Sequence, residues 1–184
     1  MSTLRRETIN NFKKIGEFDY HQVLNELGNK PLWNWLNLRK LANHGDDIIL
    51  RYQPVQGVMH PMTIMSSLEC VDYFTQSLFP KTMELVNQTF DQPIGRVVFA
   101  RLNPGDEISE HTDEGQYSES TDRFHFVLTT NPEVIMTSGN ETHHINPGEI
   151  WWFNNHIPHS VVNPGTTGRI HLIVDTLKTS TKVL

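Results

Sequence analysis

The feature that most constrains the fold of this chain is a series of turn signals that repeats through its second half. Combinations of Asn, Pro, Gly and Asp favour tight turns. From Arg96 onward they occur at Asn103-Pro104-Gly105-Asp106, Asn131-Pro132, Ser138-Gly139-Asn140, Asn146-Pro147-Gly148-Glu149 and Asn163-Pro164-Gly165. The intervals between them predict short strands at 96–102, 108–113, 123–130, 134–137, 141–145, 150–153, 159–163 and 169–177. About eight short strands are typical of a jelly roll.

The chain before Gly95 is mixed in character. Residues 48–52 read as a strand. The sequence Ser66-Ser67-Leu68-Glu69 reads as a capping box and predicts a helix that ends at Pro80. A second helix is expected over about 81–90, with Met83, Val86 and Phe90 facing inward.

These patterns predict a mainly β fold: a double-stranded β-helix (jelly roll, cupin-like) with N-terminal helices packed against it. At 184 residues the chain has the length of one domain. We therefore expect residues 1–184 to form a single domain. Residues 1–94 would be its mixed helical and strand part, and residues 95–178 the jelly-roll core that carries the functional site.

Composition restricts the classes of partner. A net charge of -6 and a sequence pI near 5.9 argue against a broad nucleic-acid interface, which needs a surplus of Lys and Arg on one face. The single cysteine, Cys70, cannot form an internal disulfide, and the longest apolar runs are too short to cross a bilayer. We expect a cytoplasmic protein without membrane segments, and the sequence leaves its oligomeric state open.

Histidines are concentrated in one part of the chain, since seven of the ten lie between His111 and His171. Alternate residues of a strand share a face, so His111 and Asp113 can reach one metal ion from a single strand end. His159, on a later strand, supplies a second imidazole. Two imidazoles and one carboxylate form the facial triad of non-haem Fe(II) oxygenases, which leaves coordination positions open for substrate and dioxygen.

Two arginines accompany this triad. The period of two places Arg123 and His125 on one face of a strand, and Arg169 and His171 on one face of another. A cation that points into a half-apolar barrel is costly unless an anion meets it. Both arginines therefore predict an acidic ligand, and the planar fork of a guanidinium suits a carboxylate.

Taken together, these residues resemble the aspartyl/asparaginyl β-hydroxylase-like family of Fe(II)/2-oxoglutarate-dependent dioxygenases, which also includes proline hydroxylases. The resemblance covers roughly 95–175. It rests on Leu102-Asn103-Pro104-Gly105, His111-Thr112-Asp113, Arg123-Phe124-His125, Pro147-Gly148-Glu149, His159-Ser160-Val161-Val162-Asn163 and Arg169-Ile170-His171-Leu172-Ile173-Val174-Asp175.

The resemblance implies roles for six residues. His111, Asp113 and His159 would bind Fe(II). Arg169 would pair with the distal carboxylate of 2-oxoglutarate, while Arg123 and His125 would line the cosubstrate site. The implied reaction uses O2 to hydroxylate an amino-acid side chain, either an aspartyl/asparaginyl-type residue in a peptide or protein or a free amino acid such as proline. It is coupled to decarboxylation of 2-oxoglutarate to succinate and CO2.

One departure bears on the substrate. Animal peptide-hydroxylating members of the family lack the carboxylate of the triad, whereas Asp113 supplies one here, which weakens the analogy to a peptide substrate. Before Gly95 no motif is specific enough to be carried over from the family. Trp33, His44 and Arg51 are candidates for substrate contacts in that part.

Several alternatives remain at the level of residues. His156 is three positions from His159 and is its direct rival as a metal ligand, although the Ser160-Val161-Val162-Asn163 continuation favours His159. Arg123 could form a core salt bridge, and His125 could be a hydrogen-bonded buried imidazole. Residues 114–122, which have no apolar periodicity, could form a mobile flap over a pocket or an ordinary solvated loop.

Two alternatives remain at the level of function. The first is a cupin-like metalloenzyme that does not use 2-oxoglutarate, against which the H-x-D spacing and Arg169 argue. The second is a non-catalytic jelly-roll binding module, in which the polar residues serve recognition only.

Overall fold

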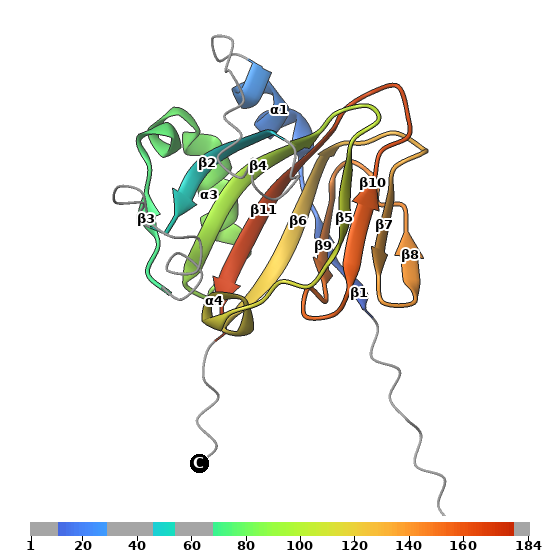
Figure 1. Ribbon diagram of the computed structural model, residues 1–184. Helices are drawn as coiled ribbons and strands as arrows, with labels where there is room; N and C mark the ends of the chain where they lie inside the picture. Colours follow the sequence, from blue (N-terminus) through green and yellow to red (C-terminus); the bar gives the residue numbers. More distant parts are fainter. Residues whose placement is uncertain (1–10, 29–45, 54–67, 179–184) are drawn as a thin grey trace, which may run out of the picture.

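The strands of the protein form two sheets that lie face to face, as the turn signals predict (Figure 1). The structure is a computed structural model and describes residues 11–28, 46–53 and 68–178. The larger sheet has seven strands in the order β1-β9-β6-β11-β4-β2-β3, and the smaller has four in the order β5-β10-β7-β8. The strands are β1 (Phe12–Glu17), β2 (Asp46–Tyr52), β3 (Val71–Asp72), β4 (Ile94–Leu102), β5 (Glu107–His111), β6 (Thr121–Thr129), β7 (Ile135–Ser138), β8 (Glu141–His143), β9 (Glu149–Phe153), β10 (His159–Val162) and β11 (Arg169–Leu177).

The expected fold class is confirmed. All eight predicted strands are present, and their bounds differ from the predicted ones by two residues at most. In addition, β2 matches the strand predicted before Gly95. The two sheets are open layers and not a closed barrel. Three strands, β1, β2 and β3, come from the part before Gly95 and extend the larger sheet at both edges.

Helices cover the outer face of the larger sheet (Figure 1). They are α1 (Tyr20–Gly28) and α3 (Pro80–Thr89), whose buried residues Val23, Met83 and Val86 pack on Phe126 and Leu172 of the sheet. The helix expected over 81–90 is therefore confirmed. Pro80 occupies the first helical turn of α3, where its missing N–H costs nothing.

A second core lies between the two sheets. It contains eight buried apolar residues, contributed mainly by strands of both sheets: Phe12, Leu102, Val127, Val134, Met136, Ile145, Phe153 and Val161. Alternation along β6 explains why Val127 faces this core while Phe126 and Leu128 face the helices. The same alternation on β11 turns Arg169 and His171 toward the inner side.

The prediction of a helix from the capping box to Pro80 is wrong for the described part of that segment, from residue 68 onward. Cys70 is in a loop, Val71–Asp72 form β3, and only Phe74–Leu78 form a 3-10 helix. Val71 pairs with Tyr52 of β2. Pairing with a strand that is distant in sequence therefore overrides the local helical spacing. Ser66 and Ser67 lie outside the described residues.

The segment after Asp113 is not an irregular solvated loop throughout. It contains a short helix, α4 (Gln116–Glu119), in which Tyr117 is only 1 % exposed. The Tyr117 hydroxyl accepts a hydrogen bond from the backbone N–H of Arg96 at 2.8 Å, and the Arg96 guanidinium lies 4.1 Å from the centre of the tyrosine ring. One buried side chain thus fixes a stretch whose sequence has no apolar periodicity.

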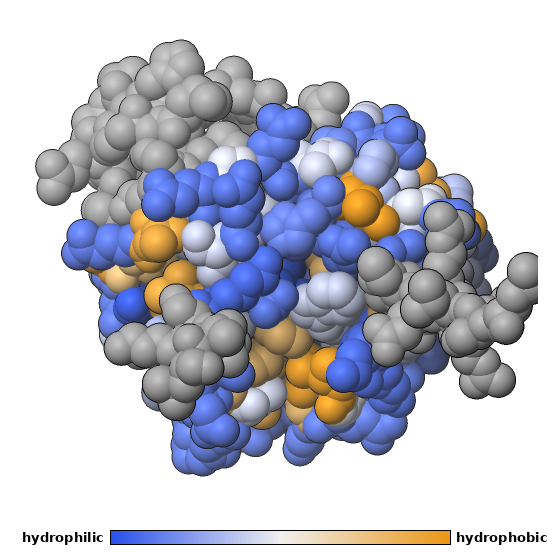
Figure 2. Space-filling view, turned by 90° about the horizontal axis from the view of Figure 1, so that it is seen from below, coloured by the Kyte–Doolittle hydropathy of each residue, from blue (hydrophilic) through white to orange (hydrophobic). Residues whose placement is uncertain are grey.

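The face of the molecule seen in Figure 2 is mainly polar. At the end of the molecule where α4 lies, hydrophilic residues dominate and hydrophobic residues form small separate areas (Figure 2). None of the helices in the described ranges is long and apolar enough to cross a membrane.

Candidate metal centre

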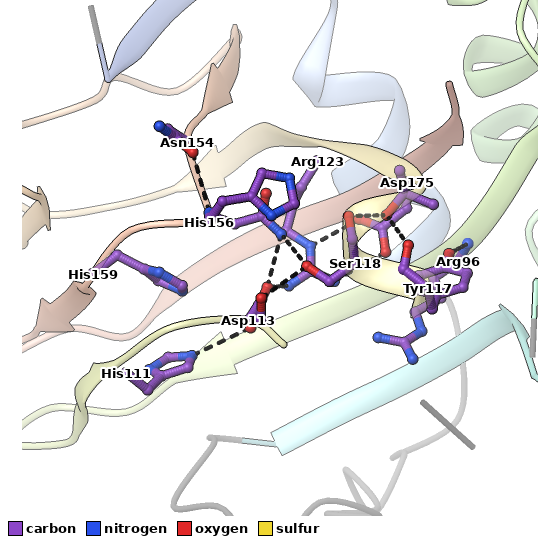
Figure 3. Close-up of polar contacts among 12 residues, drawn as sticks. Arg96, His111, Asp113, Tyr117, Ser118, Arg123, Asn154, His156, His159 and Asp175 are labelled. Carbon is purple, nitrogen blue, oxygen red and sulfur yellow. Dashed lines mark hydrogen bonds and ion pairs between the residues drawn. The ribbon is translucent and has the colours of Figure 1, made fainter. Parts of the chain in front are cut away.

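His111, Asp113 and His159 come together at one end of the smaller sheet. His111 ends β5 and His159 begins β10, and the two residues are opposite each other in this antiparallel pair. Their ring centres are 4.3 Å apart, and Asp113 lies beside them just beyond β5 (Figure 3). One ligand atom from each of the three residues lies within 4.8 Å of the others. The structure thus gathers the three residues that the sequence nominated as metal ligands.

Backbone carbonyls fix the protonation of both imidazoles. His111 Nδ1 is 2.8 Å from the carbonyl oxygen of Ser109, and His159 Nδ1 is 3.0 Å from that of Ile157. A carbonyl oxygen only accepts, so each Nδ1 must donate its hydrogen. In the neutral rings each Nε2 then keeps a lone pair, which is the form in which histidine binds metal ions.

The two oxygens of Asp113 have different surroundings. Oδ2 accepts hydrogen bonds from Arg123 Nη1 at 2.5 Å and from Asn155 Nδ2 at 3.0 Å, whereas Oδ1 lies 3.6 Å from His111 Nε2. Burial alone would raise the pKa of this carboxyl. The Arg123 charge, the nearby His111 ring and the hydrogen bond from Asn155 outweigh burial and hold the pKa well below its usual range. Asp113 is therefore an ionised carboxylate that directs Oδ1 toward the histidines.

His156 lies outside this group. Its backbone N–H donates to Asn154 Oδ1 at 3.1 Å, and its ring Nε2 is 3.2 Å from Lys178 Nζ (Figure 3). No ligand atom of His156 belongs to the three-residue cluster found among the described residues. The geometry accordingly favours His159 over His156 as the second imidazole.

Arg169 is a buried cation that pairs with none of the carboxylates of the described residues. Its side chain lines the cavity that the three candidate ligands also line, yet the residue is only 2 % exposed. None of the carboxylates in the described ranges pairs with it, and its Nε is buried without a hydrogen-bond partner there. Burial lowers the pKa of Arg169 to about 9, so the guanidinium remains charged at neutral pH. An uncompensated buried charge of this kind is costly.

Two buried histidines contact Arg169. Its Nη2 is 2.7 Å from His171 Nδ1, which in turn is 2.9 Å from His125 Nδ1. A guanidinium only donates, so His171 Nδ1 accepts and His125 Nδ1 carries a proton. Burial, together with the Arg169 charge, lowers the pKa of both imidazoles well below the ordinary value. Both rings are neutral, and the Nε2 atoms of both are buried and have no hydrogen-bond partner within the described residues.

Arg123 already has its anions within the chain. It donates through Nε and Nη2 to the two oxygens of Asp175, at 2.8 and 2.9 Å, and through Nη1 to Asp113. Asp175 is completely buried. The expectation that Arg123 requires an external acidic ligand is therefore wrong, because the salt-bridge alternative supplies both partners. Arg123 still lines the cavity, next to Asp113.

Sequence reasoning missed Asp175 and Asn155. Asp175 had a usable signal, since the period of two places it on the same face of β11 as Arg169 and His171. Asn155 lies between β9 and β10, where no pattern marks it. Of the candidate substrate contacts, Arg51 pairs with Asp72 at 2.5 Å and does not line the cavity. Trp33 and His44 lie outside the described residues.

A comparison with protein families gives a match that covers most of the chain. The model of the family described as aspartyl/asparaginyl β-hydroxylase matches residues 10–179. The chain belongs to the aspartyl/asparaginyl β-hydroxylase family. The resemblance inferred from 95–175 is thus confirmed, and the family match also includes most of the part before Gly95, in which no motif was recognised.

A curated relative and several solved structures are similar over parts of the chain. L-proline cis-4-hydroxylase of Rhizobium meliloti (strain 1021) is 33% identical over 97 residues, which cover 52% of this chain and 35% of that enzyme. The match thus spans about a third of the length of the relative. A predicted oxalate decarboxylase from Thermotoga maritima has a TM-score of 0.38 at 19% identity, over 52% of this chain and 73% of its own. A cupin domain from Bordetella pertussis has a TM-score of 0.37 at 22% identity, over 49% and 88%.

Proposed function

We propose that this protein is an Fe(II)- and 2-oxoglutarate-dependent dioxygenase that hydroxylates an amino-acid side chain. The observation that carries the proposal is that one cavity holds both the His111, Asp113 and His159 cluster and Arg169, a buried cation with no carboxylate partner among the described residues. The proposal treats residues 1–184 as a single dioxygenase domain.

The donor set fits iron. Two neutral imidazole nitrogens and one carboxylate oxygen are the ligands of the facial triad in non-haem Fe(II) oxygenases. Both Nε2 lone pairs are fixed by Nδ1 hydrogen bonds to backbone carbonyls, and Asp113 is held ionised by Arg123. Bound Fe(II) would supply the activation of dioxygen, which no amino-acid side chain can provide.

The surroundings of Arg169 fit one carboxylate of 2-oxoglutarate. A planar guanidinium binds a carboxylate through two parallel hydrogen bonds, and Arg169 keeps a buried Nε without a partner in the described structure. A bound carboxylate would remove the cost of the buried charge. His125 would line this site as a neutral ring. It would not donate a hydrogen bond to the carboxylate, because its Nε2 carries a lone pair.

The remaining residues orient the reactants and exclude water. Apolar side chains from both sheets, among them Leu102, Ile108 and Ile173, line the same cavity as the candidate metal ligands and Arg169. An apolar lining that excludes water would strengthen an ion pair at Arg169 and limit side reactions. Arg123 would act through Asp113 as a positioning residue, since Asp175 and Asp113 occupy its N–H groups.

The substrate is proposed at the level of its class. The family description names aspartyl and asparaginyl residues, and the curated relative is named for free L-proline. Asp113 is the feature that animal peptide-hydroxylating members lack, so we favour a free amino acid such as proline over a residue within a peptide.

The test of this proposal is a turnover assay with purified protein, Fe(II), 2-oxoglutarate and oxygen. Free proline, asparagine and aspartate would be compared with short peptides that contain the same residues. We expect one of these substrates to raise the release of succinate. Mass spectrometry should detect the incorporation of one oxygen atom into that substrate. A protein that binds iron but never consumes 2-oxoglutarate would support a cupin-like metalloenzyme. One that binds no metal would support a non-catalytic binding module.

A further inference from the structure

Asp113, the carboxylate of the proposed metal site, lies in a loop beyond the last residue of β5. A metal ligand must be held close to its binding geometry by its neighbours, and a loop provides less support than a strand. The contacts that hold Asp113 therefore determine how its carboxylate is presented.

Asn155 contacts Asp113 with both its backbone and its side chain. The Asp113 backbone N–H donates to the Asn155 carbonyl oxygen at 3.1 Å, while Asn155 Nδ2 donates to Asp113 Oδ2 at 3.0 Å. The same Nδ2 lies 3.2 Å from Ser118 Oγ, and Ser118 Oγ donates to the Asp113 carbonyl oxygen at 3.1 Å. Asn155 is only 2 % exposed, so these hydrogen bonds do not compete with bulk water.

Asn155 and Arg123 act on the same oxygen but in different ways. Arg123 brings a positive charge to Asp113 Oδ2 and is itself held by both oxygens of Asp175. Asn155 is uncharged, and it approaches Oδ2 from the segment that joins β9 to β10. With two donors on Oδ2, only Oδ1 is left to face the histidines, from which His111 Nε2 is 3.6 Å away.

We infer that Asn155 is a positioning residue that presents Asp113 as a one-oxygen ligand, with Ser118 orienting the Asn155 amide. This inference rests on the proposed function for its purpose, since a triad must leave coordination positions open for the other reactants. A carboxylate that turned both oxygens toward the metal would occupy one of these positions. Asn155 therefore keeps a position available without touching substrate or metal.

The variant Asn155→Ala tests this inference, because it removes the amide and leaves the ion pair of Asp113 with Arg123 in place. Asn154→Ala is the matched control: Asn154 is the neighbouring amide, but its side chain accepts from the backbone N–H of His156 and has no bond to Asp113. Ser118→Ala is the intermediate case, which removes the group that orients the Asn155 amide.

Two measurements are needed. In the first, Co(II) is titrated anaerobically into each folded protein. Loss of a residue that orients a metal ligand typically lowers the affinity for the metal by about ten- to a hundred-fold. We expect this loss for Asn155→Ala, a smaller loss for Ser118→Ala and none for Asn154→Ala. The second compares metal-free crystal structures of the wild type and Asn155→Ala, in which we expect the Asp113 carboxylate to rotate.

The two measurements separate failure of this inference from failure of the proposed function. A wild-type protein without affinity for Co(II) would refute the proposed metal site. The crystal structures alone would then decide whether Asn155 positions the Asp113 carboxylate. Unchanged Co(II) affinity in Asn155→Ala, or an Asp113 carboxylate that keeps its orientation, would overturn the inference. Thermal unfolding of the metal-free proteins shows that each variant is folded before it is titrated.

Discussion

His111 and His159 face each other across two adjacent antiparallel strands, with ring centres 4.3 Å apart and each Nδ1 bonded to a backbone carbonyl two residues before it. Strand pairing therefore sets the separation of the two rings, and the local backbone sets their tautomer. In the proposed metal site, this relationship would hold the two nitrogen ligands in place before a metal ion binds, which would lower the cost of ordering them.

The first prediction concerns the ligands themselves. His111→Ala and His159→Ala should each abolish retention of Fe(II), because the two remaining ligands form an incomplete triad. His156→Ala should retain iron at the wild-type level, since His156 contacts Lys178 and lies outside the cluster. Iron content after anaerobic desalting measures the effect. Loss of iron in His156→Ala and retention in His159→Ala would reverse the assignment.

The second prediction concerns Arg169. Replacing it with Gln should weaken binding of 2-oxoglutarate by about ten- to a hundred-fold, because charged hydrogen bonds contribute about 1.5–3 kcal/mol. Metal affinity should be unchanged, since Arg169 contacts none of the three candidate metal ligands by any hydrogen bond or ion pair of the described structure. Anaerobic calorimetric titration of the metal-loaded protein provides both values. Wild-type affinity for 2-oxoglutarate in Arg169→Gln would refute the role of Arg169.

The third prediction concerns the stability of the protein without cosubstrate. Arg169→Met should raise the free energy of unfolding of the metal-free protein, because it removes a buried charge that has no anion beside it among the described residues. Most buried substitutions have the opposite sign. Urea unfolding measures the difference. If Arg169→Met destabilised the protein by several kcal/mol, Arg169 would have a structural partner.

The fourth prediction concerns the ion pair between Arg123 and Asp175. Asp175→Asn should destabilise the protein by about 3–5 kcal/mol, the usual cost of leaving one member of a buried ion pair without its partner. It should also lower metal affinity, since Arg123 would lose the two bonds that hold it against Asp113. Urea unfolding and Co(II) titration follow the two effects, and normal values for both would contradict this account.

The fifth prediction concerns the packing of α4. A Cβ added at Gly95 would lie 2.4 Å from the Tyr117 hydroxyl oxygen and 3.2 Å from the carbonyl oxygen of Asp175. Gly95→Ala should therefore cost about 1–3 kcal/mol, as is typical when a packed core is overfilled. Gly28→Ala is the control, because a Cβ there meets no atom of the described residues within 4 Å. Equal stability of the two variants would show that Tyr117 does not anchor α4 against β4.

The alternation of residues along strands could be predicted from sequence because it is a local property. It correctly placed Arg123 with His125, and Arg169 with His171, on the inner side of the larger sheet. The H-x-D spacing likewise placed His111 beside Asp113.

Contacts between segments that are distant in sequence could not be predicted in this way. The edge strand β1 has one buried residue among six, Phe12, and one partly buried residue, Gly16, so its sequence shows no clear alternation. Val71 follows helical spacing locally, yet it pairs with Tyr52. Asn155 reaches Asp113 across 42 positions of sequence, and no pattern within either segment indicates this contact.

The most direct test of the central claim is anaerobic spectroscopy of the purified protein. Fe(II) is added first and 2-oxoglutarate second, and the visible spectrum is followed for the weak charge-transfer absorption of a keto acid chelated to iron. This absorption band should appear in the wild type and in His156→Ala and should be lost in His111→Ala. Bound iron without a band at saturating 2-oxoglutarate would contradict the claim that this site uses 2-oxoglutarate.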